Sequence, residues 1–391
     1  MGEPDLVAQS SPSARAARAI RKWLGDGLIP VGEKFPSEHA IAERLGVSRT
    51  VVHGVLVKLE KEKLLESTGP RTRVVARSVS RAPSFMSNTV AVWDKESYAP
   101  GGGETGGYSR YIQLGLARAI GEAGLHTLVL NPANLTATDV QRLATERVRG
   151  VVALHYTLNE ETRALLEALK GESLPVVVQP DSDEFGEFDM VLHDHERGSF
   201  ELTSWLLERG RRRILRFRHT PPAGSRRPAW VAERDKGFVR AHRKARIKPV
   251  PVLEAPSIRT EASTNEELFA MAAQLTAGQL TEPLRRLKKV DAIMTLSDGV
   301  VFPVIAALRI LGKKPNKDVL VTGYDNYWAD VPERAWEREG PAATVDKNNT
   351  ELGRALMAVL QERTDSPFRR ECIRRTVEPT LVVNTTGGGR R

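Results

Sequence analysis

From Thr89 onward, the sequence alternates short apolar runs typical of buried strands with amphipathic stretches of helical period. Clear apolar runs are TVAVW (89–93), LPVVVQP (174–180), DAIMTL (291–296) and DVLVTGYD (318–325). This alternation predicts parallel sheets with helices on both faces. About ten such units are more than one sheet holds comfortably, so we expect two α/β lobes.

Composition limits the class of protein. The 391 residues are 40% hydrophobic, and no run approaches the length of a membrane span, so we expect a soluble protein. The first 20 residues carry early acids and no apolar core, so we expect no secretory signal. A single cysteine fits a reducing cytoplasm. The net charge of +9 favours a polyanionic partner, though many basic proteins bind none.

The segment Phe35–Leu65 predicts two short helices joined by a tight turn. Ser37 is placed to cap the first helix, and Ser48 to cap a second helix that starts at Arg49. One face of the second helix is apolar, with Val52, Val55, Leu56 and Leu59. The other face carries Arg49, Thr50 and His53, and no acid occurs from Ser48 to Leu59. A donor-rich, acid-free helix suits the DNA major groove, and an ordinary helical hairpin is the alternative.

This segment resembles the winged helix-turn-helix of GntR-type bacterial regulators over roughly residues 13 to 77. The pattern appears as FPSEHAIAERLGVSRTVVHGVLVKLEKEKLL, followed by a wing-like GPRTRVV at Gly69–Val75. The resemblance implies DNA contacts at Ser37, His39, Ser48, Arg49, Thr50, His53, Arg71 and Arg73. His39, His53 and Arg71 depart from the residues usual in the family, so the operator is expected to differ from the common one.

Residues 89–386 resemble the LacI/GalR-type effector domain, which is related to periplasmic sugar-binding proteins. The strongest part is the block AIMTLSDGVVFPVIAALRILGKKPNKDVLVTGYDN at 292–326. The combination resembles arabinose-repressor-like regulators. We therefore expect a disordered tail at 1–12, a winged helix-turn-helix at 13–77, a linker at 78–88, and a two-lobed α/β periplasmic-binding-protein-like domain for effector binding and dimerisation at 89–386.

The second resemblance also implies effector contacts. Arg234 and Asp325 match an arginine and an acid that bind sugar hydroxyls in the family, and a salt bridge or a cap is the alternative. Ser297 replaces a family Asn, and Asp298 could equally cap the following helix. Lys347 stands where relatives often have Gln, which hints at an acidic or phosphorylated effector. The aromatic candidates are Tyr108 and Trp230.

Other motifs do not support an enzyme or a metal site. GGGETGG (101–107) lacks the Gly-Lys-Ser/Thr of a phosphate-binding loop. His193, Asp194 and His195 follow a strand, so we expect their side chains to point apart and bind no metal. The basic run RGRRRILRFRH (209–219) is interpreted as a solvated strand edge, and a second DNA contact is the alternative. We expect no cofactor and no catalytic residue.

The sequence therefore predicts a cytoplasmic, homodimeric transcription regulator, most simply a repressor, that binds an operator and a sugar-like effector. One alternative is a sugar-binding protein or sugar-metabolism enzyme whose head makes only protein contacts. Another is a regulator with a constitutive, ligand-free body.

Overall fold

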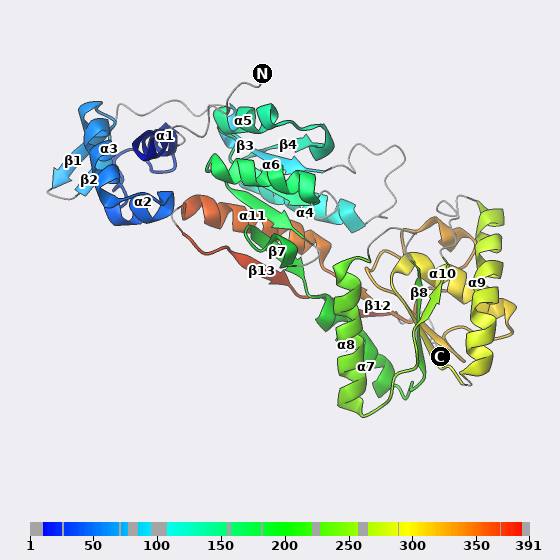
Figure 1. The fold of residues 1–391 in the computed structure, drawn as a ribbon. Coiled ribbons are helices and arrows are strands. Elements are labelled where there is room, and N and C mark those ends of the chain that lie inside the picture. Colours follow the sequence, from blue (N-terminus) through cyan, green and yellow to red (C-terminus); the bar gives the residue numbers. More distant parts are fainter. Residues whose placement is uncertain are drawn as a thin grey trace, which may run out of the picture.

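The computed structural model describes residues 11–25, 27–69, 72–76, 85–94, 108–154, 158–180, 183–220, 227–256, 265–287, 289–367 and 369–384. Figure 1 shows a small helical head at one end, followed by two α/β lobes. In the described part of the chain, no helix is long and apolar enough to span a membrane.

The head is a winged helix-turn-helix, as predicted. Its helices are α1 (Pro12–Gly25), α2 (Glu38–Leu45) and α3 (Arg49–Lys61), and its wing pairs β1 (Leu65–Gly69) antiparallel with β2 (Thr72–Val75). Gly46 adopts φ 61° between α2 and α3, a conformation that favours glycine. The predicted apolar face of α3 packs against Ile20 and Trp23 of α1 in one core.

The N-terminal lobe holds a six-stranded parallel sheet in the order β13-β7-β6-β5-β3-β4. One apolar core joins the sheet to α4 (Tyr108–Glu122) and α11 (Asn349–Asp365), and another joins it to α5 (Ala137–Thr145) and α6 (Glu160–Gly171). The strands are β3 (Thr89–Trp93), β4 (His126–Leu130), β5 (Gly150–Leu154), β6 (Val176–Gln179), β7 (Asp189–His193) and β13 (Arg374–Val377).

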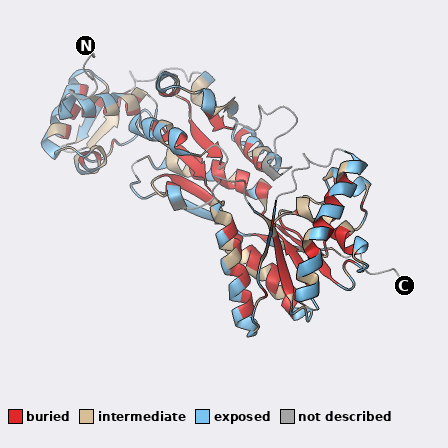
Figure 2. Ribbon diagram, turned by 45° about the vertical axis from the view of Figure 1, so that its right-hand side comes forward, coloured by how far each residue is buried: buried red, intermediate tan, exposed pale blue. Residues whose placement is uncertain are grey.

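The C-terminal lobe has a second six-stranded sheet in the order β14-β12-β11-β10-β8-β9, in which only β14 is antiparallel. Helices α7 (His195–Glu208) and α8 (Ala229–Ala245) contribute to one core, and α9 (Glu266–Arg286) and α10 (Val301–Ile310) to the other. Figure 2 shows that the strands of both sheets are largely buried. The strands are β8 (Ile214–His219), β9 (Leu253–Ala255), β10 (Ala292–Thr295), β11 (Leu320–Thr322), β12 (Ala343–Asp346) and β14 (Thr380–Val383).

The chain crosses between the lobes at 193–195, 346–349 and 377–380, because α11 and β13 return to the N-terminal lobe before β14. Asn348 ties two crossings together, donating from its amide nitrogen to the Glu378 carbonyl at 2.7 Å and to Thr380 Oγ1 at 3.1 Å. The Asp194 backbone N–H donates to the Val377 carbonyl at 3.2 Å. These bonds join the crossings into one hinge.

Close packing of α4 on α11 yields the first prediction. A Cβ at Gly353 would overlap the backbone of Ile112 and Leu116, so Gly353→Ala should destabilise the protein by about 1–3 kcal/mol through overpacking. Gly121, also on α4, has open space around it, so Gly121→Ala should be neutral or stabilising by about 0.5–1 kcal/mol. Urea unfolding of both variants measures the difference. Equal effects would contradict the packing argument.

Candidate functional site

The head presents an exposed polar face built on α2 and α3. The hydroxyl oxygens of Ser37 and Ser48 accept from Ala40 N at 3.2 Å and Val51 N at 3.3 Å, which confirms both predicted caps. The predicted DNA contacts Ser37, His39, Ser48, Arg49, Thr50 and His53 are all exposed. Burial of the opposite face of α3 fixes the direction in which these donors point.

Glu38, the first residue of α2, contacts both His53 of α3 and Arg73 of the wing. Its Oε1 lies 2.8 Å from His53 Nδ1 and 3.0 Å from Arg73 Nη1, and Arg73 Nε donates to Glu60 at 2.7 Å. Burial alone would raise the pKa of Glu38, but the His53 and Arg73 contacts outweigh it and lower the pKa. The Arg73 side chain is only 13% exposed, so in this conformation it holds the wing rather than facing phosphates. Arg71 lies outside the described residues.

A second cluster occupies the carboxyl ends of three neighbouring strands in the C-terminal lobe. Asp325 follows β11, Leu296 follows β10, and Lys347 follows β12. Asp325 Oδ1 lies 3.0 Å from both Arg234 Nη2 and Lys347 Nζ, and all three side chains are at most 8% exposed. The structure therefore brings together the predicted pair Arg234 and Asp325, with Lys347 on the same carboxylate oxygen.

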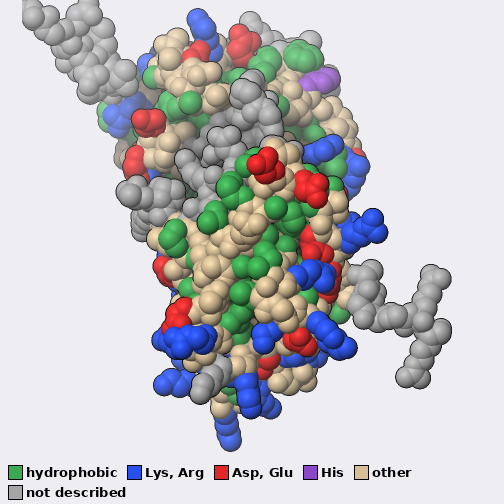
Figure 3. All heavy atoms as spheres, turned by 90° about the vertical axis from the view of Figure 1, so that its right-hand side faces the viewer, with side chains coloured by type: hydrophobic (Ala, Val, Ile, Leu, Met, Phe, Trp, Pro, Cys, Tyr) green, Lys and Arg blue, Asp and Glu red, His purple; other side chains and the backbone are tan. Residues whose placement is uncertain are grey.

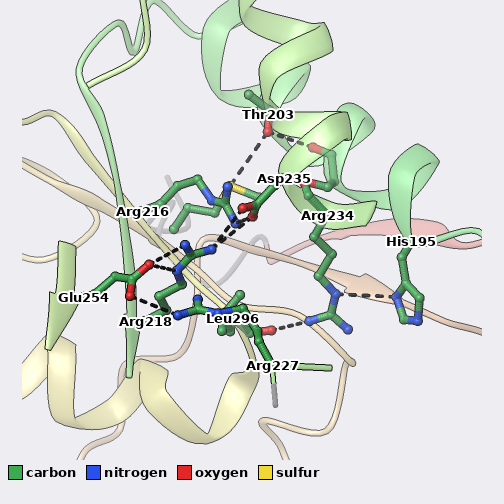
Figure 4. Close-up of polar contacts among 11 residues, drawn as sticks. His195, Thr203, Arg216, Arg218, Arg227, Arg234, Asp235, Glu254 and Leu296 are labelled. Carbon is green, nitrogen blue, oxygen red and sulfur yellow. Dashed lines mark hydrogen bonds and ion pairs between the residues drawn. The ribbon is translucent and has the colours of Figure 1, made fainter. Parts of the chain in front are cut away.

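Aromatic rings and a backbone carbonyl hold the Arg234 guanidinium. Its Cζ lies 3.5 Å from the centre of the Tyr324 ring and 4.2 Å from that of Trp230. It donates to the Leu296 carbonyl, and its Nε lies 3.4 Å from His195 Nδ1, as Figure 4 shows. Trp230, an aromatic candidate for effector contact, thus stacks on the arginine.

Electrostatics keep this cluster ionised. Burial would raise the pKa of Asp325, but Lys347 and Arg234 outweigh it and hold the pKa below its ordinary value. Two cations thus share one carboxylate oxygen in a nearly dry environment. Arg234 and Lys347 can donate to an acidic group or to hydroxyl groups of a ligand, and Asp325 can accept from hydroxyl groups.

A ladder of ion pairs beside the cluster anchors α8, the helix that carries Arg234. Asp235 pairs with Arg216 and with Arg218 at 3.0 Å, and Glu254 bonds Arg218 and, at 2.9 Å, Arg227 (Figure 4). The interpretation of 209–219 as a solvated strand edge was wrong. Residues 214–219 form β8, an inner strand between β10 and β9, and these carboxylates neutralise its arginines.

The contacts of Asp298 indicate a structural role rather than a direct contact with an effector. It is fully buried, and its carboxylate accepts from Thr344 Oγ1 at 2.8 Å, Tyr327 N at 2.9 Å and Trp328 N at 3.2 Å. These bonds hold the 323–328 loop and with it Asp325, so Asp298 positions the cluster. The Ser297 carbonyl accepts from Thr295 Oγ1 at 2.9 Å, and its side chain is half-buried. The Tyr108 side chain lies outside what the structure describes.

Sequence reasoning missed two features near the cluster. Tyr111 of α4 donates to Asp330 Oδ2 at 2.7 Å and so bridges the two lobes, although only its neighbour Tyr108 was selected from the sequence. His195 is 8% exposed and lies beside Arg234. The expectation that His193 and His195 point apart was wrong, because the strand ends at His193 and the ring centres are 5.5 Å apart. Within the described residues, no group of three or more His, Cys, Asp or Glu could hold a metal.

Comparison with known proteins supports this two-part architecture. Residues 12–74 match bacterial regulatory proteins of the gntR family, and residues 203–386 match a periplasmic binding protein-like domain. The HTH-type transcriptional repressor PurR of Vibrio vulnificus is 26% identical over 63% of this chain and 66% of its own length. PurR of Actinobacillus pleuropneumoniae is 24% identical over 83% of this chain and 89% of its own. The chain thus matches just under two thirds of the first relative.

Solved structures share the fold. A complex of the transcriptional regulator CelR with cellobiose is 20% identical, with a TM-score of 0.55 over 89% of this chain and 99% of that chain. A LacI family regulator from Enterococcus faecium with bound ribose is 19% identical, with a TM-score of 0.54 over 75% of this chain and 96% of its own.

The burial of Asp298 predicts that the free energy of unfolding depends on pH. Burial raises its pKa from 3.8 to about 7, against the opposing hydrogen bond from Thr344. The folded state therefore retains a proton that the unfolded chain loses, and this group makes stability fall by a few kcal/mol from about pH 4 to about pH 7. Asn fits the same hydrogen bonds, because Thr344 Oγ1 can accept. Asp298→Asn should abolish this slope in unfolding free energy measured against pH.

The exposed Asp318 of the same lobe provides the matched control for this measurement. Asp318→Asn should retain the slope of the unmodified protein. If Asp298→Asn also retained it, the buried carboxyl would not be its source.

Proposed function

Because the chain joins a GntR-type winged helix-turn-helix to a periplasmic-binding-protein-like body, we propose that it is a sequence-specific transcription regulator, most simply a repressor, controlled by a small-molecule effector. The observation that carries this proposal is the exposed donor face of α3, whose opposite face is locked in the core of the head. The relatives named as transcriptional repressors support the same function.

In this proposal α3 enters the major groove. Arg49, Thr50 and His53 lie on the exposed side of its first two turns, where a recognition helix contacts base edges. Glu38 holds the His53 ring through Nδ1, which leaves Nε2 for a base. Because the same carboxylate bonds Arg73, the orientation of the base-reading residue depends on the wing.

The proposed effector is a sugar or sugar derivative with an acidic group. Positioned charged groups stand at the carboxyl ends of the strands, where α/β proteins bind ligands. Cellobiose and ribose in the two solved relatives support a polyol, and the two cations Arg234 and Lys347 favour an acid. Tyr111 and Asp330 would hold the lobes together around the ligand.

We further propose that the regulator is a homodimer. Helix α9 exposes Met271 and Leu275, one turn apart, at 43% and 48%. Figure 3 shows hydrophobic side chains along this side of the molecule, with charged side chains on either side. An apolar strip with a charged border is typical of a subunit interface. Two heads would then read a two-fold related operator.

Operator selection followed by binding at increasing salt tests the DNA function. A regulator should bind one sequence tightly and lose affinity steeply with salt, because cation release accompanies phosphate contacts. A protein whose head makes only protein contacts would select no sequence. A thermal-shift screen with sugars, sugar acids and sugar phosphates then separates an effector-controlled body from a constitutive one.

If His53 reads a base, His53→Ala should weaken operator binding by about 1–3 kcal/mol and relax selectivity at one position of each half-site. Arg142→Ala is the control, since Arg142 is exposed on α5 of the N-terminal lobe and should leave affinity unchanged. Binding to a library of single-base operator variants gives both quantities. An unchanged profile for His53→Ala would contradict the assignment.

Asp325→Asn should abolish effector binding, because it removes the acceptor for hydroxyl groups and the anion that holds Arg234 and Lys347 in place. Operator affinity should stay largely intact, because the cluster lies in the lobe away from the head (Figure 1). Glu233→Gln is the matched control, as Glu233 pairs with Lys236 on the outer side of α8. Calorimetry with the screened ligand measures the effect. Wild-type ligand affinity in Asp325→Asn would place the effector elsewhere.

A further inference from the structure

The net positive charge of the chain is concentrated in one part of the C-terminal lobe. Residues 194–248, which include α7, β8 and α8, contain 16 Lys and Arg against 6 Asp and Glu, an excess of ten positive charges. The whole chain has an excess of nine, so this one part accounts for the net charge of the protein.

The cations of this part that lack an acid partner gather where α7 and α8 end. Residues 208–213 and 243–248 contain eight Lys and Arg and one acid, Glu208. Arg211 and Arg213 are half-buried. The other six are exposed and form no ion pair with any residue that the structure describes, and we call them the basic end of the lobe: Arg209, Arg212, Arg243, Lys244, Arg246 and Lys248.

The two segments lie side by side. Ile247, just beyond the end of α8, packs against the apolar cluster that contains Leu206 and Leu207 from the last turn of α7. Figure 3 shows Lys and Arg side chains gathered at the lower end of the molecule, which belongs to the C-terminal lobe. The six cations therefore form one surface.

Aromatic rings hold two of these cations in place. The Arg209 guanidinium carbon lies 4.1 Å from the centre of the Trp205 ring, and Lys244 Nζ lies 5.5 Å from that of Phe200. A cation whose stem rests on a ring is positioned before any ligand arrives, while its outer side stays open to solvent.

The ends of the helices explain only part of the charge. The negative end of a helix dipole favours Lys and Arg in the last turn, and Arg243 and Lys244 occupy such positions. Arg212 and Lys248, however, lie three or four residues past the helix ends. Surfaces usually mix charges of both signs, because like charges that face each other repel. A polyanionic partner would relieve this repulsion.

The basic end is remote from both sites described above. Helix α7 begins at His195, beside the Asp325 cluster, and its 14 residues place its other end about 20 Å away. The head rests on the other lobe, which its residues Lys22, Gly25 and Glu43 contact. Figure 1 shows the head and the C-terminal lobe at opposite ends of the molecule. DNA held by the head therefore lies away from the basic end.

We propose that the basic end binds the phosphate backbone of a second segment of duplex DNA, without selecting a sequence, while the head holds the operator. The protein then bridges two DNA segments. The choice of DNA as the polyanion rests on the proposed function of the head. Surfaces that bind anionic membranes add exposed large apolar side chains to their cations, and the two segments expose none.

Lys244 and Lys248 report occupancy of the basic end in the unmodified protein. Full-length protein is treated with a lysine-acetylating reagent, with and without an excess of duplex DNA of random sequence, and each lysine is followed by mass spectrometry. The duplex should slow acetylation of both lysines several-fold. Lys236, on the same helix but paired with Glu233, should keep its rate. Unchanged rates at Lys244 and Lys248 would overturn the proposal.

Phosphatidylserine vesicles replace DNA in a parallel measurement. Protection of Lys244 and Lys248 by these vesicles but not by the duplex would assign a membrane surface and overturn the proposal.

A double variant, Arg212→Gln with Arg243→Gln, tests the bridging. It should bind the operator as the unmodified protein does, but its operator complex should capture less of a labelled duplex of random sequence. The dependence of this second binding step on salt should weaken by about two units of log-log slope, one for each lost phosphate contact. Arg118→Gln with Arg142→Gln removes the same charge from exposed positions of the N-terminal lobe and is the matched control.

An equal loss of capture in both double variants would trace the effect to net charge and overturn the proposal. Failure of the unmodified protein to select any operator would contradict the proposed function of the head instead. The acetylation rates of Lys244 and Lys248 need no operator, so they decide the basic end in that case as well.

Discussion

The buried carboxylate of Asp325 is the interaction on which the C-terminal lobe depends. Two cations, Arg234 and Lys347, share one of its oxygens at 3.0 Å, and all three come from different elements: α8 and the ends of β11 and β12. Desolvating three charges is costly, so the arrangement persists only because every charge has a partner. Removing the carboxylate would leave two buried cations. The hydrogen bonds of Asp298 and the ion pairs of Asp235 hold the loop and the helix that bring these charges together.

Much of the fold could be predicted because it follows from local patterns. The caps at Ser37 and Ser48 and the buried face of α3 result from spacing within a few residues. The alternation of strands and helices predicts parallel sheets for the same reason. The antiparallel pairing of β14 with β12 was not predictable in this way, because it depends on a chain that leaves one lobe for the other and then returns.

The candidate site was predictable in part. Arg234 and Asp325 were found from their positions in family motifs, and the structure places them 3.0 Å apart. The second role of Lys347, as partner of Asp325, depends on the parallel pairing of β11 with β12. His195 and Tyr111 were missed because their importance arises from neighbours distant in sequence: Arg234 for His195, and Asp330 for Tyr111. From the sequence, Arg73 is expected to be available to DNA. Its partners Glu38 and Glu60 come close to it only when the wing folds against the helices, which the sequence pattern does not show.

The positions of these groups limit how an effector could act on the head. The Asp325 cluster belongs to the C-terminal lobe, whereas Lys22, Glu43 and Gly25 contact the N-terminal lobe alone. A signal within one chain therefore crosses the three hinge segments. Asn348 bonds two of them to each other, and the backbone N–H of Asp194 bonds the third to Val377. A ligand shifts the equilibrium between two arrangements of the lobes only by its differential affinity for them, typically about 1–3 kcal/mol.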